Sequence, residues 1–402
     1  MAVPKLRFKA EDGSEFPEWE KHTLGDIGSV AMCKRVFKEQ TNDRGEVPFF
    51  KIGTFGSNAD AFISRDLFNE LKTKYPYPKP GTILLSASGT IGRQVVYNGE
   101  DAYYQDSNIV WLEHDNTVLD SFLKQFYSVV KWQGLEGSTI KRLYNKNILA
   151  TGFYRPSLLE QQKIADFLST IDSIISSQKE ELAAWEQRKK GVMQKLFSQE
   201  VRFKADDGSE FPEWEEKRLE ELGSFVKGAP LSKADISLQG TPMILYGELY
   251  TTYNEVTYEI TRRTNRVVEQ KYYSRIGDVI IPTSGETPEE ISTATCVMKD
   301  GVILAGDLLI YRTNDMIDGR ILSYLLNHQI NNLIARIAQG KSVVHIQARE
   351  LKKLSVMSPI SFPEQQKIAD CLSSIDEVIQ KEKEELEKWQ ELKKGLLQQM
   401  FV

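Results

Sequence analysis

Cysteine and histidine are scarce in this sequence of 402 residues. The three cysteines are Cys33, Cys296 and Cys371. They form no close pair, which argues against a disulfide framework or a zinc site and fits a reducing compartment. The four histidines are His22, His114, His328 and His345. Their spacing matches no metal site, so the sequence predicts no metal ligands and no metal.

Long apolar runs are also absent. No segment is long enough to span a bilayer, and the first thirty residues hold six acidic side chains and no apolar run. We therefore expect a cytoplasmic protein that makes no membrane contact. The formal net charge is −6 and no region is strongly basic. We therefore expect no tight DNA binding by this chain alone through phosphate attraction, and any DNA complex would need basic surface from a partner.

Catalytic motifs are missing as well. Gly340-Lys341-Ser342 resembles the end of a phosphate-binding loop, but Ala335 stands where that loop needs glycine. The sequence has no Gly-x-Gly cofactor turn, and no Asn-Pro-Pro or Asp-Pro-Pro turn of the kind that amino-methyltransferases use to hold a base. We expect no catalytic residues and no cofactor bound by this chain.

The chain does contain one long helical pattern twice. Glu160-Gln161-Gln162-Lys163-Ile164-Ala165-Asp166 begins the first copy and Glu364-Gln365-Gln366-Lys367-Ile368-Ala369-Asp370 begins the second. Apolar residues recur in steps of four and three over more than four heptads, which is typical of a coiled coil. The predicted seam residues are Ile164, Leu168, Ile171, Ile175, Leu182, Trp185, Ile368, Leu372, Ile375, Ile379, Leu386 and Trp389. Both tryptophans are expected to serve packing. Lys189 and Lys393 also lie on the seam and should either reach solvent or pair across the helices.

Connectivity predicts the direction of the two helices. The first ends near Ser198, just before the second half of the chain, and the second begins at the far end of that half. If the helices pack on each other, they must be antiparallel. About 39 helical residues would then hold two domains up to ~58 Å apart, so the pair would act as a ruler.

A second repeat precedes each variable region. Residues 7–20 recur at 202–215 with one difference, Glu11 against Asp206. These frame segments and the openings of the helices, residues 160–172 and 364–376, are nearly identical in the two copies, whereas the regions between them have diverged. We interpret this contrast as one scaffold that presents two different readers. The alternative is that packing constrains the frames and the middles merely drifted, but the exposed-looking polar run Glu-Asp-Gly-Ser-Glu argues against packing as the only cause.

The two middles share a layout of mixed α and β structure. Short helical openings are predicted at Leu24–Ile27 and Leu219–Leu222, and buried strands at 81–86 and 277–282. Each strand runs into a polar glycine-rich loop. Helical patterns follow at Leu119–Trp132 and Ile317–Ala338, and then a β-like stretch and a proline boundary precede the long helix.

Base reading requires donors and acceptors on loops or helices that fit a DNA groove. For each single candidate, a solvated surface side chain remains the simpler interpretation. The candidates in the first middle are Lys51, Thr54, Ser57, Ser88, Thr90, Arg93, Gln105, Lys141 and Arg142, with the stretch from Gln105 to Asn108 included. Those in the second are Arg262, Arg263, Arg266, Thr283, Ser284, Lys341 and Ser342, with His345 and Gln347 nearby.

Three features now stand together: the repeated Glu-Gln-Gln-Lys-Ile-Ala-Asp helix after a proline boundary, the preceding Gly-Ser-Thr-Ile and Gly-Lys-Ser-Val segments, and the repeated order of frame, variable region and helix. In these features the chain resembles the specificity subunits of Type I restriction-modification systems. The resemblance covers nearly the whole chain and is specific as an architecture. It implies an α+β fold: two target-recognition domains separated by an antiparallel two-helix coiled coil in a pseudo-twofold tandem repeat. The expected segments are a first recognition domain with its frame (1–155), a first spacer helix (156–198), a second recognition domain with its frame (199–358) and a second spacer helix (359–402).

The resemblance also implies what this chain does and with what. Each middle would read one half of a split, asymmetric site on double-stranded DNA, and the helices would fix the unread gap. Two modification subunits would bring S-adenosylmethionine and methylate adenine, and two restriction subunits would bring ATP, Mg and cleavage. A bivalent coiled-coil scaffold for proteins, without DNA contact, is the alternative. An enzyme with an unrecognised site is a weaker one. The slightly acidic second middle departs from what a DNA reader needs, which puts its binding without partners in doubt.

Overall fold

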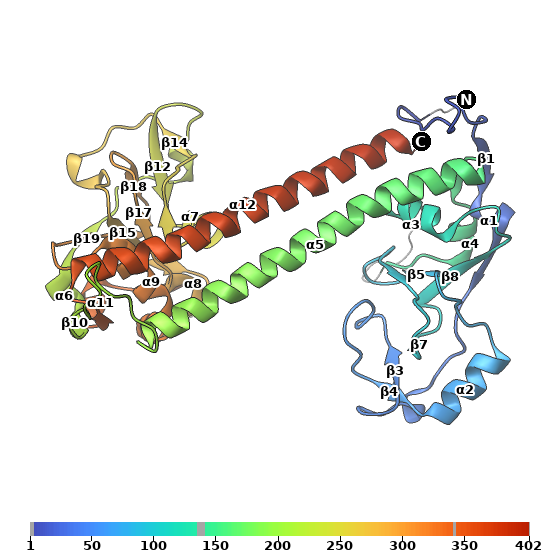
Figure 1. The fold of residues 1–402 in the computed structure, drawn as a ribbon, viewed down its shortest axis with the longest axis horizontal. Helices are drawn as coiled ribbons and strands as arrows, with labels where there is room; N and C mark the ends of the chain where they lie inside the picture. The colour runs from blue at the N-terminus through green and yellow to red at the C-terminus, as the bar shows by residue number, and fades with distance from the viewer. Residues whose placement is uncertain (1–3, 135–140, 341–342, 402) are drawn as a thin grey trace. The chain divides into compact units, whose positions relative to one another are not determined.

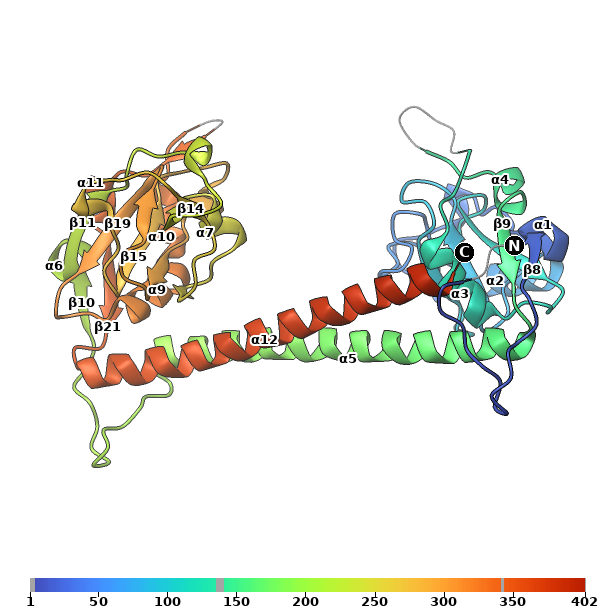
Figure 2. The same ribbon diagram turned by 90° about the horizontal axis from the view of Figure 1, so that it is seen from above.

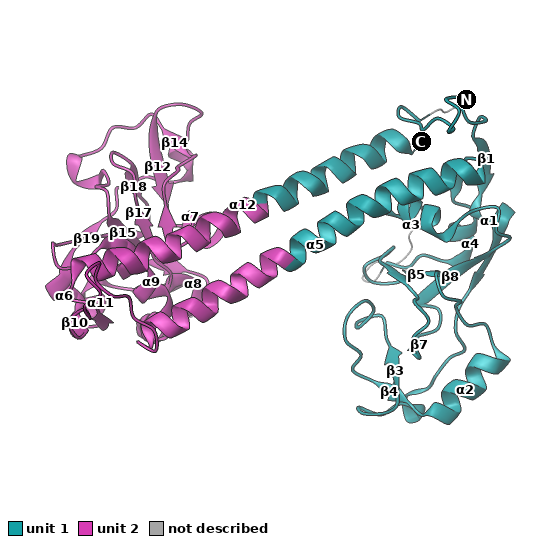
Figure 3. Ribbon diagram, in the orientation of Figure 1, with its two compact units in different colours: residues 1–180, 384–402 teal, residues 181–383 magenta. Residues whose placement is uncertain are grey.

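The computed structural model describes residues 4–134, 141–340 and 343–401. It divides into two compact units (Figure 3): unit 1 comprises residues 1–180 and 384–402, and unit 2 comprises residues 181–383. Unit 1 contains the first head (residues 20–155) and unit 2 contains the second head (residues 215–358). Each unit also takes in part of both long helices, whereas the four predicted segments separate heads from helices.

The first head has an antiparallel four-stranded sheet in the order β2-β8-β5-β6, a three-stranded sheet β4-β3-β7 and the pair β1-β9. Its strands are β1 (Glu20–Thr23), β2 (Gly28–Ala31), β3 (Val47–Phe50), β4 (Phe62–Ile63), β5 (Ile83–Ser86), β6 (Gln94–Val96), β7 (Tyr103–Tyr104), β8 (Ile109–His114) and β9 (Gly152–Arg155). Its helices are α1 (Leu24–Ile27), α2 (Arg65–Lys74), α3 (Asp120–Val129) and α4 (Asn145–Leu149), with a 3-10 turn η1 at Lys38–Gln40 (Figure 1).

The second head repeats this connectivity with a larger sheet, β11-β19-β15-β17-β13, beside the sheet β14-β12-β18 and the pairs β10-β21 and β16-β20. Its strands are β10 (Glu215–Arg218), β11 (Gly223–Lys227), β12 (Thr241–Leu245), β13 (Val256–Thr257), β14 (Arg263–Thr264), β15 (Asp278–Pro282), β16 (Ser284–Gly285), β17 (Thr295–Val297), β18 (Ile303–Ala305), β19 (Leu308–Thr313), β20 (Val344–His345) and β21 (Ser355–Ser358). Its helices are α6 (Leu219–Leu222), α7 (Glu248–Thr251), α8 (Pro288–Ile291), α9 (Gly319–His328), α10 (Asn331–Ile337) and α11 (Ala348–Leu351), with 3-10 turns η2 (Lys233–Asp235) and η3 (Gln270–Tyr272). The mixed α/β class is therefore confirmed.

Most predicted elements of the heads are present. The short openings form α1 and α6 at the predicted residues, and the two glycine-led buried strands form β5 and β15, each starting one or two residues after its glycine. The single helix predicted for Ile317–Ala338 is wrong, because the chain leaves the helix at Gln329 and resumes at Asn331. Ile330 at that break is buried, so a periodic apolar pattern continued across it and concealed it.

The two long helices are α5 (Leu158–Phe197) and α12 (Phe362–Met400), both continuous in two perpendicular views (Figures 1 and 2). Pro363 is the second residue of α12, where its missing N–H costs no helical hydrogen bond. In unit 1 the head core contains the start of α5 and the end of α12, through residues such as Leu168 and Leu397. In unit 2 it contains the end of α5 and the start of α12, through residues such as Leu196 and Leu372.

Direct contacts between α5 and α12 occur within each unit. In unit 1, Lys393 forms an ion pair with Asp172, and Gln178 donates to Glu385 at 3.3 Å. In unit 2, Lys189 lies 2.6 Å from Asp376, and Lys383 lies 3.2 Å from Glu186. Within each unit, residue numbers fall in α12 as they rise in α5, which is antiparallel order. Both seam lysines therefore pair across the helices, one of the two outcomes that the sequence left open.

Burial along the predicted seam is uneven. The seam residues that are buried are Ile164, Leu168, Ile171, Ile175, Ile368, Leu372 and Ile379, and those that are half-buried are Leu182, Trp185, Ile375, Leu386 and Trp389. Most of the buried ones belong to the core clusters of the heads. The residues near the ends of the seam therefore have two roles, because they pack into the core of a head and also face the other helix.

Each frame segment is attached to its long helix by one buried carboxylate. The Arg7 guanidinium donates to Glu160 through Nε at 2.9 Å and Nη2 at 2.7 Å, and Trp19 Nε1 donates to the same carboxylate at 3.0 Å. Glu160 is completely buried. We call these three residues the first frame anchor. A bidentate charge-assisted pair of this kind is among the stronger polar contacts in proteins.

The second frame anchor consists of Arg202, Trp214 and Glu364. Arg202 donates to Glu364 through Nε at 3.1 Å and Nη2 at 3.0 Å, and Trp214 Nε1 donates at 3.2 Å. The next residue of each helix also has a fixed role. Gln161 donates to the carbonyls of Thr117 and Pro156, and Gln365 makes the equivalent bonds to Met316 and Pro359. The repeated Glu-Gln pair is therefore a structural joint between helix and head.

The polar run of the frame also has a structural explanation. Asp12 accepts hydrogen bonds from the backbone and hydroxyl of Ser14, and Gly13 has φ 84°, a conformation that favours glycine. Asp207, Gly208 and Ser209 repeat this turn. Turn chemistry therefore constrains these polar residues, so local structure accounts for this polar run in both copies.

Candidate nucleic-acid interface

Three segments of the first head meet beside the end of β5. Ser88 Oγ donates to Asn108 Oδ1 at 3.0 Å, and Arg142 Nη2 donates to the same oxygen at 2.9 Å. The backbone closes the same joint, because Ala87 N donates to Asn108 O at 2.7 Å and Leu143 N donates to Ala87 O at 2.9 Å. We call Ser88, Asn108 and Arg142 the first triad. It joins the loop after β5, the turn before β8 and the segment before α4.

Two hollows border the first triad. One, of about 510 Å³, is lined by Arg35, Lys38, Lys51, Gln105, Asp106, Asn108 and Arg142 among others. The other, of about 550 Å³, is lined by Met32, Ser107, Arg142, Leu143, Tyr144, Asn145 and Lys146. Arg142 and Ser107 belong to both. The guanidinium has five N–H donors, and among the described residues it uses Nη2 on Asn108. It is therefore placed to offer donors to a ligand.

The charges around the first of these hollows, of about 510 Å³, nearly balance. Arg35 pairs with Asp106 at 2.9 Å, and Lys51 pairs with Asp60 at 2.8 Å. Exposed pairs of this kind contribute little to stability and exchange partners readily. The surface of this hollow therefore offers hydrogen-bonding side chains and has no strong positive charge, in keeping with the net charge of −6 of the chain.

The structure brings some first-head candidates to this place and gives others internal roles. Lys51, Gln105 and Arg142 line the first hollow, Ser88 lies in the triad, and Lys141 is exposed beside it. Gln105 also accepts from Ile52 N at 2.8 Å, which holds the loop containing Lys51. The remaining candidates support loops: Thr54 Oγ1 bonds the Lys51 backbone, Ser57 bonds Thr54 O, Thr90 O accepts from Ser86, and Arg93 Nη1 donates to Phe55 O.

The second head holds a matching joint at the end of β15. Ser284 Oγ donates to Asp307 Oδ2 at 3.0 Å, and Ser284 pairs with His345 in the β16-β20 ladder. Thr283 N donates to Asp307 O at 2.8 Å, and Ile346 N donates to Thr283 O at 3.2 Å. We call Ser284, Asp307 and His345 the second triad. Asp307 and His345 are both exposed.

The basic cluster predicted for the second head lies elsewhere on it. Arg262 pairs with Glu248 at 3.3 Å, Arg263 donates to Gly240 O at 2.9 Å, and Arg266 pairs with Asp235 at 2.8 Å. Between described residues, no hydrogen bond or ion pair joins these arginines to Ser284 or Asp307. Lys341 and Ser342 fall outside the described residues, as do Gly137, Ser138 and Thr139 of the first head.

Sequence reasoning missed Asp307 and named Asn108 only as the end of a range. The two residues share a position in the fold. Asn108 directly precedes β8, which pairs with β5, and Asp307 directly precedes β19, which pairs with β15. Single residues at the end of a strand are common, so this signal becomes specific only once the strand pairing is known.

Among the described residues no metal-ligand cluster occurs, and burial raises the pKa of all three thiols, Cys371 included. Nowhere in residues 4–134, 141–340 and 343–401 do three or more His, Cys, Asp or Glu side chains gather as metal ligands. Burial raises the pKa of Cys33 to about 12 and that of Cys296 well above its ordinary value, so neither thiol is a ready nucleophile. No helix within the described part of the chain has the length and apolarity needed to cross a bilayer.

Comparison with known proteins gives a consistent result across the chain. The family model for the Type I restriction modification DNA specificity domain matches residues 17–187 and 212–388. A Haemophilus influenzae protein provisionally named as a type I restriction enzyme specificity subunit is 52% identical over 155 residues, which span 38% of this chain and 40% of that protein. The type I restriction enzyme MjaVIII specificity subunit of Methanocaldococcus jannaschii is 23% identical over 408 residues, covering 95% and 92% of the two chains.

A solved structure agrees in fold. The crystal structure of the Type-I restriction-modification system S subunit from M. genitalium aligns with a TM-score of 0.67 and 16% identity, and the alignment covers 100% of this chain and 99% of that one. At this level of identity the likeness concerns the fold alone.

Proposed function

Since the chain belongs to the family of Type I restriction-modification specificity subunits, as the matches to both halves establish, we propose that it is a non-catalytic subunit whose two heads each read one half of a bipartite, asymmetric DNA site. The observation that carries this proposal is the pair of triads. One backbone joint occurs in both heads, and it presents different side chains in each. A shared scaffold with unlike donors and acceptors is what reading two unlike half-sites requires.

The long helices would form the antiparallel coiled coil and set the gap between the half-sites. Support comes from the α5–α12 contacts inside each unit and from the 40 and 39 residues of the two helices. At 1.5 Å per residue each helix is about 60 Å long, which allows half-sites roughly one to two turns of DNA apart.

The partners of this subunit would carry the chemistry. Two modification subunits would supply S-adenosylmethionine and methylate adenine, and two restriction subunits would supply ATP-dependent, Mg-dependent cleavage. The repeated frame segments and helices would dock two copies of one partner, because a duplicated surface offers the same contact twice. Both frame turns are exposed at their tips, Glu11–Glu15 and 206–210, which makes them available for such docking.

Mapping of methylated adenines tests this function. The chain is expressed with the modification subunit of its own system in a host that lacks other adenine methylation, and methylated positions are read by single-molecule sequencing. We expect one motif in two specified halves with a fixed unspecified gap. Methylation without such a motif, or no dependence of methylation on this chain, would overturn the proposal. Retention of partner proteins without sequence-specific DNA binding would instead support the scaffold alternative.

A further inference from the structure

We propose that the two triads are equivalent base-reading positions, and that Arg142 with Asn108 in the first head and His345 with Asp307 in the second determine one base pair in each half-site. This inference rests on the proposed function and deepens it by naming the determinants. It begins from the equivalence of the two joints, which comes from backbone bonds and not from side-chain likeness.

The two joints are closed by the same set of backbone and serine hydrogen bonds. In each head the residue before the triad serine donates its N–H to the carbonyl of the triad's second residue, at 2.7 Å from Ala87 and 2.8 Å from Thr283. The residue after the third member donates back to Ala87 O or Thr283 O. Both serine side chains are buried and both donate to the second residue's side chain at 3.0 Å. The same three segments are therefore fixed in the same way.

The backbone bonds of the two joints are the same, but the side chains at the second and third triad positions differ between the two heads. Arg142 and His345 follow corresponding glycine-containing segments, and Asn108 and Asp307 precede corresponding strands. If Arg142 existed to close the joint, the second head would need an arginine too. It closes the same joint with His345, using backbone bonds and Ser284. The backbone bonds and the serine are thus common to both joints, and the arginine is the part that differs between them.

The chemistry of the two sets points to different bases. Arginine donates through a fixed fork that fits O6 and N7 of guanine in the major groove. Asn108 supplies the oxygen that orients this fork, at 2.9 Å from Nη2. Aspartate accepts hydrogen bonds and pairs with the N4 amino group of cytosine. Asp307 is exposed and directed by a single bond from Ser284, so it can accept from such an amino group.

Access supports the same assignment. Arg142 borders both hollows of the first head, so space lies next to its side chain in each of them. The exposed ring of Tyr144, two residues later, lies at the same edge. A base edge approaching the triad would meet Arg142 between polar groups of the first hollow and the apolar Met32 and Leu143 of the second.

Reciprocal exchange tests the inference in the full chain bound to its modification subunits. One variant carries Asn108→Asp with Arg142→His, so that the first head has the second head's pair. The other carries Asp307→Asn with His345→Arg. Lys79→Ala is the matched control, because Lys79 is an exposed cation of the first head that belongs to none of the three triad segments. Methylated adenines are mapped, and binding is measured on duplexes substituted at each position of both half-sites.

We expect each exchange to change the preference at one base pair of one half-site by about 5- to 150-fold and to leave the other half-site intact. Arg142→Lys, which keeps the charge without the fork, should lose the preference for guanine at that position. Lys79→Ala should leave the motif unchanged.

Three results would overturn the inference. The first is a motif that stays the same in both exchange variants. The second is a loss of affinity that is uniform across all substituted duplexes, which would make Arg142 a phosphate contact. The third is an altered motif accompanied by a large fall in the unfolding midpoint. The proposed function is tested separately, and it fails if the unaltered chain directs no bipartite motif.

Discussion

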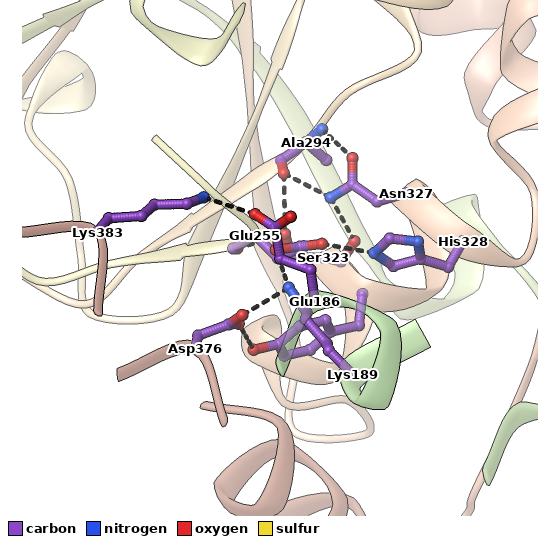
Figure 4. A network of polar contacts seen from close by, with 10 residues as sticks. Glu186, Lys189, Glu255, Ala294, Ser323, Asn327, His328, Asp376 and Lys383 are labelled. Carbon is purple, nitrogen blue, oxygen red and sulfur yellow. Dashed lines mark hydrogen bonds and ion pairs between the residues drawn. The ribbon is translucent and has the colours of Figure 1, made fainter. Parts of the chain in front are cut away.

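Lys189 of α5 lies 2.6 Å from Asp376 of α12, inside unit 2. The same ammonium lies 2.8 Å from Glu255 of the second head, and His328 of α9 contacts that glutamate at 2.5 Å (Figure 4). The side chains of Lys189, Glu255 and Asp376 are each less than a fifth exposed. One lysine therefore ties two helices and a head together through two carboxylates that would otherwise repel each other.

Removal of this lysine should destabilise unit 2. Lys189→Ala leaves Glu255 and Asp376 buried without their shared cation, so we expect a loss of about 3–5 kcal/mol in the free energy of unfolding. Urea unfolding followed by tryptophan fluorescence measures it. Lys190→Ala, at the exposed next position, should change the free energy by less than about 0.5 kcal/mol. Equal effects of the two substitutions would contradict the structural role of the network.

The equivalent residue in unit 1 should matter less. Lys393 is the repeat counterpart of Lys189 and pairs with Asp172. Asp172 is more exposed, at 26%, and keeps a hydrogen bond from Gln125 at 3.0 Å after the lysine is removed. We expect Lys393→Ala to cost about 1.5–3 kcal/mol, which is the value of a hydrogen bond to a charged group. A cost above that of Lys189→Ala, in the same urea experiment, would show that burial does not control these energies.

The same network should make stability depend on acid. Burial alone would raise the pKa of Glu255, but the His328 and Lys189 contacts lower it to about 2. Its unfolded pKa is near 4.3, so the ionised carboxylate stabilises the fold above about pH 5, and this contribution of ~3 kcal/mol is lost as pH falls toward 2. The pKa of Asp376 is raised, chiefly by burial, so its protonation opposes part of the loss.

Unfolding midpoints at pH 7, 5 and 3 check this dependence. The unaltered chain should lose more stability between pH 5 and pH 3 than Glu255→Gln, which has no carboxylate to protonate at that position. Glu255→Gln should already be less stable at pH 7. Parallel pH profiles for the two proteins would show that Glu255 is not the titrating group.

Much of this architecture could be predicted from the sequence, for identifiable reasons. The long helices follow from a period that extends over dozens of residues, and α1, α6, β5 and β15 follow from short, strongly patterned segments. The charge network could not be predicted, because Glu255 lies in a loop and shows no pattern that links it to Lys189, 66 residues away. The triads were missed as sets for the same reason. Ser88, Asn108 and Arg142 are brought together only by strand pairing.

The frame anchors predict matched effects in the two halves. Glu160→Gln and Glu364→Gln each keep the shape of the side chain and remove the charge that holds Arg7 or Arg202. We expect each to cost about 1.5–3 kcal/mol in the unit that contains it. Glu18→Gln, an exposed change in the same frame segment, is the control and should be nearly neutral. Differential scanning calorimetry measures all three. If the unfolding transition of either anchor variant stayed at the temperature of the unaltered chain, that carboxylate would not have the role given to it here.

The ruler proposal makes a prediction about distance rather than stability. Seven residues with the seam pattern can be inserted into α5 after Glu180 and into α12 before Glu384, at the division between the two units. One heptad in each helix keeps the apolar seam in phase and lengthens the pair by ~10.5 Å, which corresponds to about three base pairs at 3.4 Å each. We expect the methylated motif to keep both half-sites and to gain up to about three unspecified base pairs between them.

Insertion into only one helix is the control for that experiment. Seven extra residues in α5 alone leave α12 too short to match, so the Lys189–Asp376 and Lys393–Asp172 pairs cannot both keep their partners. Methylation should then fall without a new gap length. If the double insertion left the gap unchanged, the helices would not set the spacing. If it changed the bases read, the heads and the helices would not be the independent modules that their separate cores and matched joints indicate.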